Sequence, residues 1–458
     1  MEKVSNELDY STKVSNHSTI NYRDVPPQNS QTVTLSPNGT VGPTEFILSS
    51  SVFNPSKTKL QFKLSIAASS NSTKNLLSAN LLKTISRLVV YDSGTNALLV
   101  DINNFDKYSD MMEYSVSKEE LKKKAFLKNK APPVNLASAI LKTVEERQRD
   151  NTLTDDGNRL YGKTLDGTGL ASNNLIPVGD EELDSPLFTY ESAAASTGIV
   201  VDVSIPLSAF KGTILAQDNL IYSPTNIVIQ IYWNATNQFA CKPIAVLTGV
   251  GTAVGTTTIS QLNMSMAIES NLSITSKVIS KVMGEGISFN TPYASVIKQS
   301  MSSRAHAFSL QITRAYGNRI LFIMVAKFGQ SPFQLGERAI GNVTRYQTTL
   351  NSIPIKYPKG FDCTRGEHYT LGNKAYIENS LIQSRTLYNQ RFCHIDSFFG
   401  ERSLCDIDYN DVDGLDVSSQ SSVYGWDASL ATESAADYHI IVMGHKVITF
   451  TSMGATIQ

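Results

Sequence analysis

TKLQFKLSI, residues 58–66, alternates strictly between apolar and polar side chains. Successive side chains of a β-strand point to opposite faces of its sheet, so this period of two predicts a strand buried on one face only. The apolar face carries Leu60, Phe62, Leu64 and Ile66, and the polar face carries Lys59, Gln61, Lys63 and Ser65. Residues 58–66 therefore predict a β-sheet that packs against a core.

Similar patterns recur along the rest of the chain. SRLVVYDSGTNALLVDI, residues 86–102, places two apolar runs around turn residues and predicts a hairpin. HAFSLQITRAYGNRILFIMVAKF, residues 306–328, predicts another hairpin over Tyr316, Gly317 and Asn318. Further strands are predicted at 198–210, 226–233, 261–268 and 437–452. The chain is therefore predicted to be all-β, with two β-rich halves.

Breaks in these patterns suggest how the chain is divided. Residues 1–42 are polar and interrupted by Pro and Gly, which predicts an N-terminal arm that only a neighbouring molecule would order. The first β-rich half spans 43–246, with a helical and loop insertion at 103–196. A Gly/Thr-rich connector at 247–258 then leads to the second half, 259–458.

The insertion is predicted to begin with two short helices and to continue as a long surface loop. Ser117 and Glu120 form a capping-box pattern before the first helix, and the second follows a Pro-Pro break. Five lysines, at 122, 123, 124, 128 and 130, fit a solvated helix face better than a nuclear signal or a phosphate patch.

Composition excludes several classes of protein. The 458 residues include 40 Lys and Arg against 41 Asp and Glu, a net charge of −1 that does not favour direct nucleic-acid binding. Apolar runs such as ILFIMVA at 320–326 fall short of the ~20 residues that cross a bilayer. The polar first residues lack a secretory signal core, and Cys241, Cys363, Cys393 and Cys405 show no disulfide-framework spacing. The sequence thus predicts a protein made in the cytosol or nucleus.

GNRLYGKT, residues 157–164, matches the letters of a phosphate-binding loop, with Lys163 and Thr164 in the phosphate and Mg²⁺ positions. Such a loop requires a buried strand before it and a helix after it, and both flanks here are polar and Gly-rich. Asp202 resembles a Mg²⁺-directed carboxylate at a strand end, but the apolar strand continues past it. The match is therefore predicted to be accidental.

Two groups of residues have the chemistry of metal ligands. Cys363, His368, Cys393, His394 and Cys405 contain zinc-compatible atoms, but no two cysteines have the close spacing that zinc sites favour. Residues 405–417 begin like a calcium loop with Asp406, Asp408 and Asn410, and then have Asp411 where Gly is required and Val417 where Glu is required. An acidic surface loop is the better interpretation, with an irregular cation site as the alternative.

His439 and His445 lie on one face of the last predicted strand, but six residues separate them by about 20 Å, too far to share a metal. No nucleophile elbow and no distinctive pair of carboxylates appears. The sequence therefore predicts no catalytic, cofactor-binding or metal-binding residues and no enzymatic activity.

The order of the segments resembles that of the double jelly-roll major capsid proteins of the adenovirus, virophage and Polinton-like lineage. The segments that carry the resemblance are 46–66, 86–112, 205–233, 261–286 and 438–452. It implies two consecutive eight-stranded jelly rolls, with short helices and long loop insertions, that stand side by side and perpendicular to a shell.

The same resemblance implies a function and its partners. Three copies would form a homotrimer, a pseudo-hexagonal capsomer in the icosahedral shell of a double-stranded DNA virus. The partners would be neighbouring capsomers and the penton and minor capsid proteins, with no sequence-specific nucleic acid. The protein would reside in the virion after assembly in the host cytoplasm or nucleus.

An alternative from another class is a two-domain β-sandwich that binds glycans or a receptor, as a lectin or spike does. Tyr424 and Trp426 in SSVYGWDAS, if exposed, would stack on sugar rings; an aromatic that anchors a loop is the commoner role. An NTPase built on residues 157–164 is a third and weaker alternative.

Overall fold

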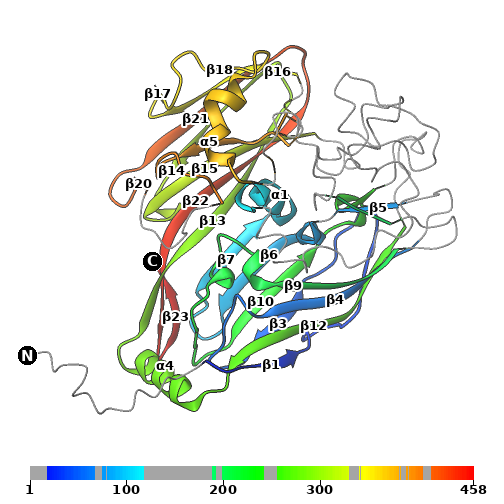
Figure 1. The fold of residues 1–458 in the computed structure, drawn as a ribbon, viewed down its shortest axis with the longest axis vertical. Coiled ribbons are helices and arrows are strands. Elements are labelled where there is room, and N and C mark those ends of the chain that lie inside the picture. The colour runs from blue at the N-terminus through cyan, green and yellow to red at the C-terminus, as the bar shows by residue number, and fades with distance from the viewer. Residues whose placement is uncertain are drawn as a thin grey trace, which may run out of the picture.

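The computed structural model describes residues 18–67, 75–78, 80–117, 188–191, 199–241, 255–329, 340, 342–380, 382, 388–389, 391–405 and 414–458. These residues form mainly antiparallel sheets, gathered into two sandwiches that lie next to each other (Figure 1). Three segments discussed above lie outside the described residues: the phosphate-loop match at 157–164, the lysines at 122–130 and most of the acidic loop at 405–417.

The first sandwich consists of two main sheets. One has the order β1-β12-β4-β9, with β2 also pairing with β12, and the other has the order β3-β10-β6-β7. The bounds are β1 Ile20–Val25, β2 Val33–Leu35, β3 Thr44–Leu48, β4 Lys59–Ile66, β6 Ile85–Asp92, β7 Leu98–Asn103, β9 Ile199–Pro206, β10 Ile227–Trp233 and β12 Thr257–Glu269. A small third sheet joins β11 (Ala240–Cys241), β5 (Asn75–Ser78) and β8 (Phe188–Glu191).

The second sandwich repeats this plan. One sheet has the order β13-β22-β15-β19, with β20 also pairing with β15 and β23 with β22. The other has the order β14-β21-β16-β17, with β18 beside β16. The bounds are β13 Ile287–Met301, β14 Ala305–Ile312, β15 Arg319–Gly329, β16 Val343–Leu350, β17 Ile353–Pro354, β18 Phe361–Asp362, β19 His394–Ser397, β20 Leu415–Asp416, β21 Ser422–Leu430, β22 Ala436–Thr451 and β23 Gly454–Ile457.

Both sandwiches share one pairing rule. In chain order, the first main strand pairs with the eighth, the second with the seventh, the third with the sixth and the fourth with the fifth. In the first sandwich these pairs are β1 with β12, β3 with β10, β4 with β9 and β6 with β7. In the second they are β13 with β22, β14 with β21, β15 with β19 and β16 with β17. A long two-stranded ribbon folded onto itself in this way is a jelly roll, so the predicted pair of jelly rolls is confirmed.

The alternation in residues 58–66 determines how β4 packs. Its even-numbered side chains are buried and its odd-numbered ones are half-buried, as predicted. Phe62 meets Trp233 of β10 edge to face, with 5.4 Å between ring centroids, so the two sheets share one core. Trp233 is fully buried and its Nε1 donates a hydrogen bond of 2.7 Å to Thr44 Oγ1 on β3.

The hairpin predicted for 86–102 is present as β6 and β7. The hairpin predicted for 306–328 is wrong, because β14 pairs with β21 in one sheet and β15 pairs with β22 in the other. Residues 313–318 therefore cross between sheets. Their turn signal is real, since Gly317 has a φ of +128°, but local turn chemistry does not distinguish a hairpin from a crossing between sheets.

Residues 20–35, expected to belong to an arm ordered only by a neighbour, instead provide β1 and β2, both paired with β12 of the same chain. Four of the six β1 side chains are exposed, so hydrogen bonds of the backbone hold the strand and no apolar period marks it. Residues 1–17 lie outside the described residues.

Residues 261–268, placed in the second half by the sequence, belong to β12 of the first jelly roll. The Gly/Thr-rich stretch at 247–258 therefore leads into the last strand of that roll, which begins at Thr257. The helix α4 (Leu272–Gly284) leads from β12 to β13, and we propose that the division between the rolls lies there.

The rolls contact each other along a seam that we define by three places. Strand β7 lies next to β13, and α1 (Phe105–Met111) packs against β22 (Figure 1). At the far end of the seam, Thr95 Oγ1 in the turn after β6 donates a hydrogen bond of 2.5 Å to the Ala455 carbonyl of β23. None of the helices in the described part of the chain has the length and apolar composition of a bilayer-spanning segment.

Gly317 provides a test of the crossing at 313–318. A Cβ at this position would lie 2.7 Å from the carbonyl oxygen and 2.8 Å from the amide nitrogen of His445, at a φ that suits only glycine. We expect Gly317→Ala to lower the free energy of unfolding by at least about 2 kcal/mol, measured by urea denaturation. The control is Gly284→Ala in α4, where no atom lies within 4 Å of the added Cβ. An equal effect of the two variants would contradict the tight packing of the crossing.

Candidate functional site

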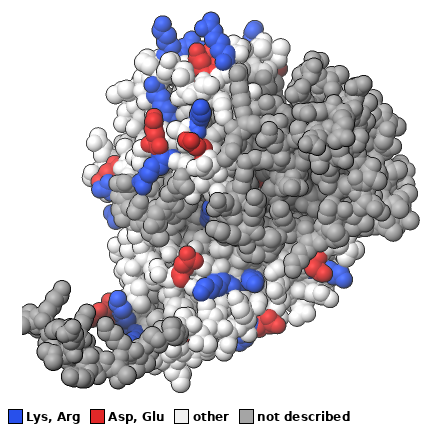
Figure 2. Space-filling model, viewed as in Figure 1, with Lys and Arg blue, Asp and Glu red and all other residues white. Residues whose placement is uncertain are grey.

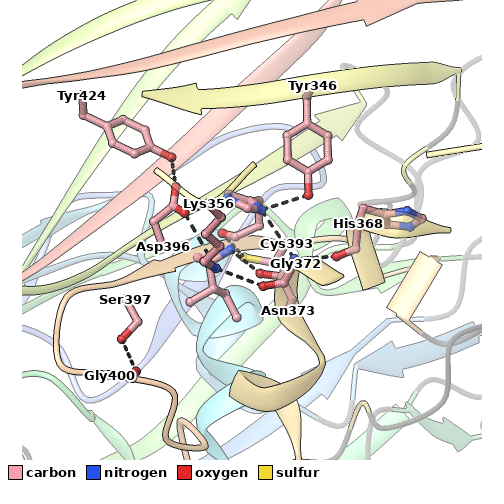
Figure 3. A network of polar contacts seen from close by, with 12 residues as sticks. Tyr346, Lys356, His368, Gly372, Asn373, Cys393, Asp396, Ser397, Gly400 and Tyr424 are labelled. Atoms are coloured by element: carbon pink, nitrogen blue, oxygen red, sulfur yellow. Dashed lines mark hydrogen bonds and ion pairs between the residues drawn. The ribbon is translucent and has the colours of Figure 1, made fainter. Parts of the chain in front are cut away.

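Two clusters of buried titratable side chains lie in the described core. The first lies inside the second roll and centres on Asp396 (Figure 3). His394 and Asp396 are two residues apart on β19, so both point to the same face of their sheet, while Tyr346 of β16 and Tyr424 of β21 reach them from the facing sheet.

The contacts of Asp396 form a continuous network. Tyr424 donates its hydroxyl to Asp396 Oδ2 at 2.8 Å, and His394 Nε2 lies 3.1 Å from Asp396 Oδ1. The other ring nitrogen of His394, Nδ1, lies 2.9 Å from the Tyr346 hydroxyl. Lys356 Nζ lies 3.8 Å from Asp396 Oδ1 and donates hydrogen bonds to the carbonyls of Gly372 and Ile395 at 2.9 and 2.7 Å.

Burial and pairing determine the charges in this network. Burial acts to raise the pKa of Asp396, but the neighbouring His394, Lys356 and Tyr424 outweigh it and lower the pKa to about 2. Burial lowers the pKa of His394, and the neighbouring Asp396 opposes this effect. Burial also lowers the pKa of Lys356 to about 8, which leaves most of this lysine charged and able to balance the carboxylate.

The Asp396 network has the residue types of an acid–base catalytic site, but a substrate cannot reach them. Asp396, His394 and Tyr424 are fully buried, and Tyr346 is 1% exposed. A general base must come within hydrogen-bond reach of a substrate proton, and these atoms face only other core side chains. The arrangement joins the two sheets of the second roll through hydrogen bonds.

The predicted zinc-compatible residues are partly brought together. His368 Nε2 lies 2.8 Å from Asn389 Oδ1, and Cys393 lies next to His394 in the buried network, with its Sγ 3.7 Å from the His394 carbonyl. Cys405 instead contacts the Tyr114 carbonyl at 3.5 Å, and burial raises the pKa of Cys363 to about 12. Within the described residues, no three His, Cys, Asp or Glu side chains are placed to hold a metal ion.

The sugar-stacking role considered for Tyr424 and Trp426 is wrong, because both side chains point inward. Tyr424 is fully buried and Trp426 is 2% exposed. Trp426 stacks on Tyr346 with 4.7 Å between ring centroids. The alternation of β21 places both residues on its core face.

The second cluster, which we call the junction cluster, joins the two rolls. Lys83 in η2 (Leu81–Thr84) forms an ion pair with Asp110 of α1, and Arg391 Nη1 of the second roll lies 3.1 Å from the same carboxylate. Glu113 in η3 (Met112–Ser115) supplies a second negative charge nearby. All four side chains are buried. Burial is the main cause that lowers the pKa of Lys83, and Asp110 opposes it.

The seam also contains His439 of β22. Its ring meets Phe328 of β15 edge to face at 5.0 Å, and Lys107 of α1 lies over the same Phe328 ring, 5.4 Å from its centroid. Burial lowers the pKa of His439 to about 4, with Lys107 and Lys298 adding to this effect and Asp106 and Asp437 opposing it. His445 is also buried on β22.

Asp202 lies in the middle of β9, opposite Lys63 of β4, so the strand does continue past it as predicted. The sequence did not point to Tyr346, Lys356 or Asp396. The only local signal was a polar pair, His394 and Asp396, inside the apolar and aromatic run 392–399. Nothing local connects Lys83 or Asp110 with Arg391, which lies 281 positions after Asp110.

No protein-family model matches the chain, and the comparison with curated proteins finds no match. Solved structures do match over nearly the whole chain. A chain of the Sputnik virophage structure is 10% identical, with a TM-score of 0.54 over 100% of this chain and 92% of its own. The Faustovirus major capsid protein is 9% identical, with a TM-score of 0.53 over 97% of this chain and 92% of its own.

A third match is PBCV-1 VP54, as fitted into a reconstruction of Sputnik. It is 8% identical, with a TM-score of 0.50 over 98% of each chain. At these identities the likeness concerns the fold, which is the double jelly roll of major capsid proteins.

The junction cluster gives a prediction on stability. We expect Asp110→Ala to lower the free energy of unfolding by about 3–5 kcal/mol, because it leaves Lys83 and Arg391 buried without their shared carboxylate. Asp101→Ala serves as the control, since its pair with Arg87 at 2.8 Å is partly exposed and contributes at most about 1 kcal/mol. Urea denaturation measures both, and similar losses would refute the importance of the buried cluster.

His439 gives a prediction on pH dependence. Its folded-state pKa of about 4 lies below the ordinary value of 6.5, so the unfolded chain binds the proton more tightly. Stability that is present above pH 6.5 is therefore lost as the pH falls toward 4, by up to about 3 kcal/mol. We expect His439→Gln to reduce this loss in thermal unfolding between pH 7 and 4.5. His306 and His394, whose pKa values are also lowered, remain in both proteins and contribute the same pH dependence to each. An unchanged pH profile in the variant would therefore contradict the role of His439.

Proposed function

We propose that this protein is a major capsid protein, whose trimers form pseudo-hexagonal capsomers in the icosahedral shell of a DNA virus. The observation that carries the proposal is the repeated topology: two jelly rolls of the same strand order lie next to each other in one chain. Capsid proteins with this double fold match almost the full length of the chain.

The geometry of the double roll supports a trimer. A jelly roll has a roughly rectangular cross-section, so two fused rolls repeated about a threefold axis present six similar walls. Six walls tile a hexagonal lattice with three chains instead of six. A closed ring of this kind also satisfies every head-to-tail interface and leaves no free end from which a filament would grow.

The surface charge is consistent with a shell protein whose genome is held by other components. The whole chain has a net charge of −1. Figure 2 shows Lys and Arg next to Asp and Glu over the described part of one face, with positive side chains gathered at its upper end. Mixed charge of this kind favours contacts with other proteins over binding along a nucleic-acid backbone.

The proposed partners are other copies of the chain, first within the trimer and then in neighbouring capsomers, together with penton and minor capsid proteins. The protein would reside in the virion after assembly in the host cytoplasm or nucleus. The proposal assigns it no cofactor and no catalytic activity. The fold comparisons support this role over a lectin or spike, and the burial of Tyr424 and Trp426 removes the aromatic argument for sugar binding.

The oligomeric state tests the proposal. Three chains of 50.1 kDa should elute together at about 150 kDa, since the interface within a capsomer is expected to be obligate and larger than ~2,000 Å². Size exclusion coupled to light scattering at micromolar concentration measures this mass. A concentration-independent monomer would contradict the capsid role, whereas a dimer would contradict the threefold geometry and leave the fold unaffected.

A further inference from the structure

Helix α4 presents an apolar stripe to the outside. Only Val282 of its 13 residues is fully buried, while Leu272 is 80% exposed and Met283 is 50% exposed. At 100° per residue, Leu272, Ile279 and Met283 lie within about 40° of one another around the helix axis. We call these three residues the α4 stripe. Lys277 and Lys281 are exposed on the polar side of the same helix.

A fourth apolar side chain extends the surface at the end of α4. Met453, in the turn between β22 and β23, is 77% exposed. The chain passes from α4 into β13, whose first residue Ile287 pairs with Phe450 of β22, so this turn lies near the end of the helix (Figure 1). Clusters of exposed apolar side chains on a globular protein mark a surface that another segment or molecule covers.

The N-terminal part of the described chain is attached where α4 begins. Glu269 accepts hydrogen bonds from the Ser18 hydroxyl, from the Thr19 amide at 2.9 Å and from the Asn271 amide at 2.8 Å. The Asn271 side chain in turn caps α4 by accepting from the amides of Ser273 and Ile274. One buried carboxylate thus joins residues 18–19 to the first turn of the helix, next to Leu272.

We propose that residues 1–17 of the same chain lie along α4 and cover the α4 stripe. Ser18, the first described residue, is hydrogen-bonded to Glu269, three positions before Leu272, so the segment is tethered beside the first turn of α4. Seventeen residues reach up to about 55 Å when extended, whereas the 13 residues of α4 are about 20 Å long. The segment is therefore long enough in any conformation from helix to strand.

The composition of residues 1–17 complements the helix. They include four apolar side chains after Met1, namely Val4, Leu8, Tyr10 and Val14, which suit a stripe of Leu, Ile and Met. They also carry three acidic residues, Glu2, Glu7 and Asp9, against two basic ones, Lys3 and Lys13, and the acidic residues can pair with Lys277 and Lys281. This inference does not depend on the proposed capsid function.

Attachment next to α4 favours the chain's own segment over other occupants. A segment tethered through a short connection has an effective local concentration in the millimolar range, which exceeds the micromolar concentration of other copies in solution. An unlinked partner would have to displace it. The stripe is therefore covered from within the chain.

Zero-length cross-linking with a carbodiimide tests the contact in the purified full-length protein. We expect peptides in which Glu7 or Asp9 is joined to Lys277 or Lys281. Copies labelled with light and with heavy nitrogen are unfolded together in urea and refolded as a mixture before cross-linking, so that any oligomer contains both labels and the source of the segment can be identified. Cross-links within one label support the proposal. Abundant mixed-label cross-links would overturn it and assign the segment to a neighbouring copy.

Limited trypsin digestion provides a second, independent measurement. The double variant Leu272→Ser/Met283→Ser should increase the rate of cleavage after Lys3 and Lys13 by about tenfold, because it removes the apolar contacts that protect the segment. Both substituted side chains are exposed, so the fold should not change. The control is Ile353→Ser on β17, which is 70% exposed and should leave cleavage unaffected.

Two further results would overturn the proposal. One is equal cleavage of the wild type and the double variant. The other is that the wild-type protein floats with vesicles of phosphatidylcholine and phosphatidylserine whereas the double variant does not. That result would make a lipid surface the partner of the stripe.

Discussion

The junction cluster holds the two jelly rolls in one relation to each other. Lys83 and Asp110 come from the first roll and Arg391 from the second, and all three are buried. Removing each charge from water costs several kcal/mol, and only the complete cluster offsets that cost. Apolar contacts alone would tolerate small shifts between the rolls, because they are not directional. We interpret the cluster as the feature that selects a single placement of the rolls.

The rest of the seam is consistent with this role. Strand β7 lies next to β13, so the exposed edges of two sheets cover each other and are not left free to pair with another molecule. Asp92, fully buried at the end of β6, accepts hydrogen bonds from the Ser223 hydroxyl and the Thr95 amide, and the Thr95 hydroxyl donates to the Ala455 carbonyl. The seam therefore has polar contacts of defined geometry at two separate places, the Thr95 turn and the junction cluster, and these oppose sliding of one roll along the other.

The sequence predicted strands correctly where the apolar residues alternate clearly. It did not predict which strands pair when the partners lie far apart in the chain. The alternation in 58–66 and the turn at 93–96 gave correct strands, because both are local properties of the chain. The crossing at 313–318 and the strands in 20–35 were missed, because only the partner strand distinguishes them from a hairpin and from an arm. His394 was noted, but its partners Asp396 and Tyr346 were not, since the facing sheet brings them together.

The same distinction explains how this chain shares its fold with solved structures to which it is only 8–10% identical. Backbone hydrogen bonds and alternating apolar residues are sufficient for the ribbon pairing of a jelly roll, and many sequences provide them. Side-chain identity matters at the seam, where a buried charge without its partner would destabilise the chain. In the proposed capsid role, contacts between capsomers would also have to form reversibly, so that misplaced copies can leave, and wet polar walls would suit this requirement. That role would therefore place the strongest and most specific interactions inside the chain, at the junction cluster, and the weaker ones on its outer walls.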